Sequence, residues 1–227
     1  MKKSIVLLLV CALTIALMPV SAEKAPTLTG EWYASRYGAV ITLTLNEDGT
    51  YSMASALTAE PAEGTWTVEG SLIYLDGEDA PSAFAVGDGL RWTDENLLFS
   101  RERPAPVYTP AEVIRKAERP AAASNMDLFQ GYWVAQYAEL NGETVLIDVL
   151  GFETDIYVEG KRAALGGELF GDVIADIRYS NSAYTCKVGG GKLTLEMQQD
   201  GFMRLTLVTD EKTTVLYLAS VYLGMAE

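Results

Sequence analysis

Histidine is absent from this chain of 227 residues. Its absence excludes the Ser-His-Asp and Cys-His nucleophile systems, zinc sites with histidine ligands and haem held by a proximal histidine. It also removes the side chain that most often acts as a general base near neutral pH. Paired carboxylates are common, but nearly all of them fall in expected turns, where solvent surrounds them. We therefore expect a protein that is not an enzyme and that has no cofactor and no metal site.

Cysteine is almost as scarce, with only Cys11 and Cys186 in the chain. Cys11 falls within an N-terminal segment that we expect to be removed, so the mature chain is expected to have no intramolecular disulfide. Cys186 falls in an expected strand next to Lys187. Because adjacent strand residues point to opposite faces, this lysine is not expected to activate the thiol. We expect Cys186 to be buried and unreactive.

The N-terminus has the pattern of a secretory signal peptide. Lys2 and Lys3 precede an apolar run over residues 5–20, and small residues follow at positions 21 and 22. The run is shorter than the roughly 20 residues that a membrane-spanning helix needs. We therefore expect residues 1–22 to be a cleaved signal peptide and the protein to be secreted, or extracytoplasmic, in a bacterium.

Basic residues are few. The chain has 17 Lys and Arg against 31 Asp and Glu, which gives a formal net charge of −14. A surface this acidic repels phosphate backbones and anionic lipid headgroups. We therefore expect neither nucleic acid nor a membrane surface as a partner, and no membrane insertion once the signal peptide is cleaved. A small apolar ligand and an extracellular protein remain as candidate partners, and the oligomeric state is left open.

Most of the remaining sequence alternates between apolar and polar residues with a period of two, which is typical of β-strands. In the segment 40–53, for example, Ile41, Leu43 and Leu45 share one face, and Asp48-Gly49 supplies a hairpin turn. Turn signals recur every 8 to 12 residues. The pattern predicts about eight short strands between positions 30 and 101. We expect an all-β protein whose first unit, residues 28–102, is a small antiparallel barrel.

Proline interrupts this pattern in residues 103–127, which contain four of the eight prolines of the chain. Such a composition is typical of a linker. Within it, Thr109, Pro110 and Glu112 form a helix-start signal, with threonine as the N-cap and glutamate closing a capping box. We expect one short helix from about 110 to 118.

A second unit follows in residues 128–227. Its opening, GYWVAQ at 131–136, repeats the opening GEWYAS at 30–35, and the two lie 101 positions apart. Alternating segments and turn signals then continue to the end of the chain. The segment 143–150 is ambiguous, because its short apolar run suits either a strand or a helical turn. We expect a second small antiparallel barrel.

Four short motifs carry a resemblance to a known family. They are TGEW at 29–32, EDGTY at 47–51, EGTW at 63–66 and QGYW at 130–133. Together they resemble bacterial secreted lipocalin-like domains, members of the calycin group of β-barrels, in two copies. The resemblance covers most of both units, although each motif is short.

The resemblance implies a role for the residues at the closed end of each barrel. Gly30 and Gly131 would bring the chain across the barrel floor, and Trp32 and Trp133 would plug it. Lipocalins commonly lay an arginine from the last strand over this tryptophan, and Arg101 is the matching residue of the first unit. The second unit departs from the pattern, because its last segment, VLYLASV, has no arginine.

Aromatic residues suggest where a ligand would bind. Tyr51, Trp66, Phe84 and Trp92 fall near inward positions of the first unit. Core packing is the ordinary role of such rings, and a partly open apolar pocket is the alternative. We expect a non-enzymatic extracytoplasmic binding module, with a small apolar ligand in the first barrel. The alternative is a secreted protein-interaction or inhibitor module with solid barrels and no ligand cavity.

Overall fold

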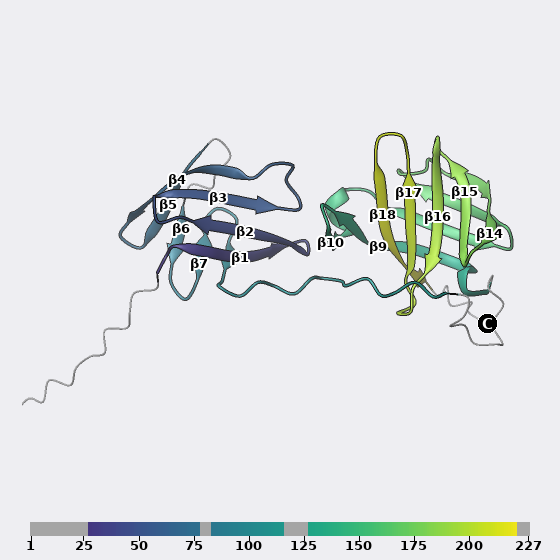
Figure 1. Ribbon diagram of the computed structural model, residues 1–227, viewed down its shortest axis with the longest axis horizontal. Helices are drawn as coiled ribbons and strands as arrows, with labels where there is room; N and C mark the ends of the chain where they lie inside the picture. The colour runs from purple at the N-terminus through teal and green to yellow at the C-terminus, as the bar shows by residue number, and fades with distance from the viewer. Residues whose placement is uncertain (1–26, 78–82, 116–126, 222–227) are drawn as a thin grey trace, which may run out of the picture.

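The computed structural model describes residues 27–77, 83–115 and 127–221. It is an all-β structure of two nearly closed antiparallel barrels, one after the other along the chain (Figure 1). The expected signal peptide lies outside the described residues.

The first barrel is a simple meander in which each strand pairs with the next. Its eight strands are β1 Gly30–Arg36, β2 Ala39–Leu45, β3 Thr50–Ser55, β4 Ala62–Glu69, β5 Leu72–Asp76, β6 Phe84–Val86, β7 Leu90–Trp92 and β8 Leu97–Phe99. Tyr33 and Ser100 close the ring, since each backbone N–H donates to the other's carbonyl at 2.8 Å. The prediction of eight strands between positions 30 and 101 is confirmed.

The second barrel contains ten strands in one sheet. They are β9 Gly131–Leu140, β10 Glu143–Leu146, β11 Thr154–Glu159, β12 Arg162–Gly167, β13 Val173–Asp176, β14 Arg178–Ser180, β15 Ala183–Val188, β16 Gly191–Met197, β17 Met203–Val208 and β18 Thr213–Val221. The sheet runs in the order β13-β12-β11-β9-β18-β17-β16-β15-β14, and β10 pairs with β9 alone. Because β13 and β14 are separated only by Ile177, this one stretch of chain joins both ends of the sheet and nearly closes it.

The ambiguous segment 143–150 contains both of the structures that its sequence allows. Residues 143–146 form β10, and Ile147–Leu150 form a single turn of 3-10 helix. Gly151 ends this turn with φ +69°, a left-handed conformation that glycine adopts without steric cost.

The linker does not contain the predicted helix in its described part. The described part of the expected helix, residues 110–115, is not helical. Val113 instead forms an isolated bridge with Gln198, and the N–H of Ile114 donates to the carbonyl of Met197 at 2.8 Å. A helix of two turns is marginal by itself, so pairing with the second barrel outcompetes the local helix signal. Residues 116–118 lie outside the described part of the chain.

Tyr108 anchors the linker to the outside of the second barrel. Its ring stacks on Tyr137 with centroids 4.7 Å apart and meets the edge of Tyr217 at 5.1 Å. Its hydroxyl lies 2.7 Å from the amide oxygen of Gln198 and 2.8 Å from the carboxylate of Asp200. The linker is therefore packed on one barrel along residues 108–114 and does not run freely between the two.

Candidate functional site

The open end of the first barrel holds a pocket of about 660 Å³. Its inner wall includes Ile41 on β2, Met53 on β3 and Trp92 on β7. The outer wall is the loop between β3 and β4, which contributes Leu57 and Pro61 among others. Apolar and aromatic side chains thus dominate the walls, as is usual for sites that bind small molecules.

Strand alternation explains why these inner-wall side chains point into the barrel. Trp92 pairs directly with Phe84, whose ring is fully buried in the core. Met53 lies two residues beyond the buried Tyr51 on the same strand, so both face inward. Buried and pocket-lining residues therefore both point into the barrel, and they differ only in how far along the barrel axis they lie.

The charges at the mouth are already paired or exposed. Arg36 at the end of β1 forms an ion pair with Glu95 at 3.2 Å, and both side chains are about two-fifths exposed. Glu60 in the wall loop is exposed. A surface pair of this kind contributes at most about 1 kcal/mol. Because Arg36 is neutralised by Glu95, the mouth has no strong attraction for an anion.

The indole N–H of Trp92 is shielded from solvent, and no acceptor for it lies among the described residues. A buried donor without an acceptor costs about 1–3 kcal/mol. Native proteins seldom retain such a group without a reason. Trp92 therefore combines an unpaired buried donor with a position in the pocket lining.

The four predicted pocket rings belong to one hydrophobic cluster, in which the rings of Phe84 and Trp92 lie 6.0 Å apart, but they do not line a pocket together. Tyr51 and Phe84 are buried in the core of the first barrel, and only Trp92 lines the mouth. Trp66 lies at the other end, where its indole N–H donates to the carbonyl of Asn46 at 3.0 Å. The ligand-binding role of the four rings stays a prediction, and the geometry favours Trp92 alone.

Much of the mouth does not follow from strand alternation. Alternation places Ile41 on one apolar face with Leu43 and Leu45 but does not show that it borders a pocket, and it says nothing of the wall loop at 56–61. A signal was present, because this connection is longer than the neighbouring hairpin turns and combines Ala56, Leu57 and Pro61 with few charges. Long connections at the end of a rigid barrel are common positions for binding residues.

The closed end of the first barrel lies around Trp32, which is 4% exposed. The guanidinium of Arg101 sits over its ring, 3.7 Å from the ring centroid. Arg101 also donates to the carbonyls of Thr27, Glu31 and Thr29, the last two at 2.8 and 2.9 Å. This arginine therefore ties the chain entering the barrel to the chain leaving it.

Trp133 is the corresponding ring of the second barrel and is 3% exposed. Its indole N–H donates to the carbonyl of Phe129 at 2.9 Å, and Trp32 makes the matching bond to Leu28 at 2.8 Å. Each bond spans four residues across a glycine with positive φ, Gly131 or Gly30. The repeated opening of the two units is thus one local structure used twice.

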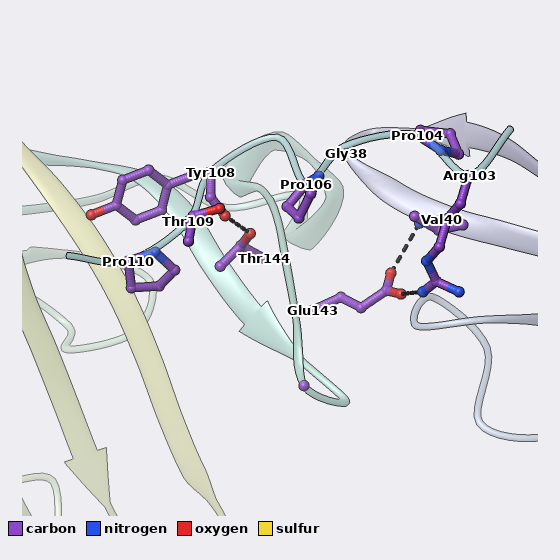
Figure 2. A pocket seen from close by; sticks show the side chains of 11 residues that line it. Gly38, Val40, Arg103, Pro104, Pro106, Tyr108, Thr109, Pro110, Glu143 and Thr144 are labelled. Atoms are coloured by element: carbon purple, nitrogen blue, oxygen red, sulfur yellow. Dashed lines mark hydrogen bonds and ion pairs between the residues drawn. The ribbon is translucent and has the colours of Figure 1, made fainter. Parts of the chain in front are cut away.

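A second, smaller pocket of about 380 Å³ lies between the barrels, beneath the linker (Figure 2). Glu143 on β10 extends into this groove. One of its carboxylate oxygens accepts from the N–H of Val40 at 2.9 Å, and the other pairs with Arg103 at 3.1 Å. A single glutamate therefore connects the second barrel to a strand of the first barrel and to the linker.

Two further bonds join the mouth of the first barrel to the second barrel. The N–H of Leu146 donates to the carbonyl of Tyr37 at 2.9 Å. The side-chain amide of Asn141 donates to the carbonyl of Ala56 at 3.0 Å. Because Tyr37 and the segment around Ala56 belong to the pocket region, contacts with the second barrel help to fix the shape of the mouth.

Cys186 lies on β15 and is partly buried. Burial raises the pKa of its thiol, which keeps it in the neutral, less nucleophilic form. Among the described residues, no group of three or more Asp, Glu or Cys side chains is placed to hold a metal ion. Within the same residues, no helix has the length and apolar character that crossing a bilayer would require.

Comparisons with protein-family models, with curated proteins and with solved structures found no match for this chain.

Proposed function

We propose that this protein is a non-enzymatic, extracytoplasmic binding module that takes a small, neutral, apolar ligand at the mouth of its first barrel. The observation that carries the proposal is the 660 Å³ pocket with Ile41, Met53 and Trp92 in its inner wall. Pockets of several hundred Å³ with apolar walls and a few polar groups suit small organic molecules.

Electrostatics support a neutral ligand over an anionic one. Residues 30–101 carry three basic and twelve acidic side chains, a net charge of −9. The one cation of the pocket lining, Arg36, is paired with Glu95. A negatively charged ligand would therefore meet an unfavourable potential on approach and no free counter-charge on arrival.

The other parts of the proposal rest on the sequence. An apolar N-terminal run after two lysines supports export. The lack of histidine and of a nucleophile constellation supports a binding role over a catalytic one.

A matched pair of ligands tests the proposal. A fatty alcohol and a fatty acid of the same chain length would compete against a neutral dye whose fluorescence rises in apolar surroundings. We expect the alcohol to displace the dye at lower concentration than the acid. Trp92→Ala should weaken dye binding by about tenfold, equivalent to 1.4 kcal/mol. Leu98→Ser, on the outer face of the same barrel, is the control and should leave binding unchanged.

Two outcomes would contradict the proposal. If Trp66→Ala abolishes binding and Trp92→Ala does not, the ligand occupies the closed end. If no dye or alcohol binds to the full chain, the first barrel is not a ligand-binding barrel.

A further inference from the structure

An apolar row crosses the outside of the second barrel. Val221, Tyr132, Tyr157, Ala164 and Ile174 lie on five neighbouring strands, β18, β9, β11, β12 and β13, and we call them the exterior stripe. Each member is the direct register partner of the next. Since adjacent strands lie about 4.8 Å apart, the stripe is about 19 Å long.

The stripe faces solvent and not the core. Ile174 is 72% exposed, Tyr157 44% and Val221 38%. Their chain neighbours Ile156, Val158 and Ala175 are buried, as strand alternation requires for an outward-facing row. Single exposed apolar residues are normal on protein surfaces, whereas here they adjoin one another in register over five strands and form one continuous patch.

Acidic side chains border the stripe on both sides. Asp155 lies two residues before Tyr157 on the same strand, and Glu159 lies two residues after it. Asp176 follows Ile174 by two residues on β13. The one basic residue of these flanking rows, Arg162, pairs with Asp176 at 3.6 Å. The border therefore keeps a net negative charge around an apolar centre.

The geometry points to the exterior stripe as a docking surface for a protein partner whose contact segment is apolar at its centre and basic at its edges. Charge complementarity selects this occupant, because lysine or arginine side chains beside the apolar contact would meet Asp155 and Glu159. A second copy of this chain is disfavoured, because each copy carries a net charge of −14 and the two acidic borders would repel each other.

The size of the stripe indicates the form of the contact. The row crosses five strands but is only one side chain wide. It therefore offers much less area than the roughly 800 Å² that each partner buries in a stable interface between globular proteins. It suits an extended segment or a hairpin laid along the row, with Tyr157 and Ile174 as its main apolar contacts. Tyrosine is frequent among the residues that dominate binding energy in interfaces. This surface is separate from the mouth of the first barrel and does not depend on ligand binding there.

The test uses a random peptide library displayed on phage, selected on the immobilised full chain. The comparison variant is the double substitution Tyr157→Ser with Ile174→Ser. The matched control is Val208→Ser, because Val208 is 46% exposed on β17 of the same barrel but lies outside the stripe. Thermal unfolding should be nearly the same for all three proteins, because exposed substitutions usually change stability by about 0.5 kcal/mol or less.

We expect the enriched peptides to combine apolar residues with Lys or Arg. Synthetic copies should bind the native chain and the Val208→Ser variant equally, and the double variant at least about tenfold more weakly. A second variant, Glu159→Gln with Asp176→Asn, leaves the apolar row intact. This variant should bind the basic peptides more weakly, and the binding should depend less on salt concentration.

Three results would overturn the proposal. The first is selection of acidic or uncharged peptides, or of peptides that bind the double variant as well as the native chain. The second is a selection in which no peptide is enriched on the native chain relative to the double variant. The third is a dimer in analytical ultracentrifugation that the double variant loses, which would make a second copy the occupant.

Discussion

The two barrels begin with the same backbone structure but cover their closed ends differently. In both, a tryptophan donates to the carbonyl four residues earlier, across a glycine with positive φ. In the first barrel the cover is the guanidinium of Arg101 over Trp32. In the second barrel Phe129 lies at the closed end, fully buried, with its ring 4.9 Å from that of Tyr184.

A glycine and a tryptophan thus form the closed end of both barrels, whereas the side chains that pack over the tryptophan differ between the two. A cation over a ring satisfies backbone carbonyls and tolerates partial exposure. A cluster of aromatic rings must be excluded from water and gains its stability from burial. In the second unit, whose last strand has no arginine, this position is taken by Phe129 from the turn before β9 and Tyr184 from β15.

The largest expected effect comes from removing either floor tryptophan. Trp32→Ala and Trp133→Ala should each destabilise their own barrel by about 3–5 kcal/mol, because each leaves a large cavity at a buried position. Scanning calorimetry of the full chain would measure this as a downward shift of one transition in each variant. If each variant shifts both transitions equally, the barrels unfold as one unit and the comparison between separate floors fails.

The next largest effect is expected for substitution of the two glycines, and its size should differ between them. Gly30→Ala and Gly131→Ala should each cost about 1–3 kcal/mol, because φ values of +99° and +112° strain any residue with a Cβ. Gly30→Ala should cost more, because its Cβ would lie 3.1 Å from a guanidinium nitrogen of Arg101, whereas the space around Gly131 is open. Denaturant unfolding measures both, and a larger cost at Gly131 would contradict the role given to Arg101.

A smaller effect is expected for the covering arginine. Arg101→Ala should weaken the first barrel by about 1 kcal/mol through loss of the ring contact, with the second barrel unchanged. Arg91→Ala is the control for the loss of one positive charge, because Arg91 is an exposed residue that donates to Asn96 and touches neither floor. Equal destabilisation by the two substitutions would mean that net charge, and not the contact with Trp32, is responsible.

The last effect appears only at alkaline pH. Burial raises the pKa of Tyr184 and Tyr217 in the second barrel and that of Tyr108 in the linker packed on it. A raised pKa means that the folded state holds the proton more tightly than the unfolded chain does. This contribution to stability is complete below the unfolded pKa of about 10 and is lost as the pH rises above it.

We therefore expect the second barrel to lose stability before the first as the pH rises above about 10. Urea unfolding at neutral and alkaline pH, followed with tyrosinate absorbance, would measure this order. In the first barrel Tyr33 also has a raised pKa, chiefly through its hydrogen bond to Glu31, but its side chain is only partly buried. Earlier alkaline unfolding of the first barrel would contradict the expectation.

Much of the fold could be predicted from the sequence, because alternation identifies strands and their inward faces without knowledge of their partners. The eight strands of the first barrel and the all-β class follow from that pattern. The expected helix at 110–118 failed in its described part because a local signal cannot report the competing pairing of Val113 with Gln198. That pairing joins positions far apart in the sequence.

The candidate site was predicted only in part, for a related reason. Alternation places both Trp66 and Trp92 at inward positions but does not say at which end of the barrel each ring lies. Strand direction and register settle that depth, and they place Trp66 beside Asn46 at the closed end and Trp92 at the mouth. The same holds for Glu143, whose sequence neighbours give no sign of its bonds to Val40 and Arg103.

The sequence by itself determined the two units, their repeated Gly-x-Trp openings and the faces of their strands, because each of these depends on residues close together in the chain. Tertiary structure alone decided which end of the first barrel holds the pocket, how the linker packs, and how residues from five strands form one exterior stripe. Those features depend on register between distant strands, and register is fixed only when the whole sheet closes.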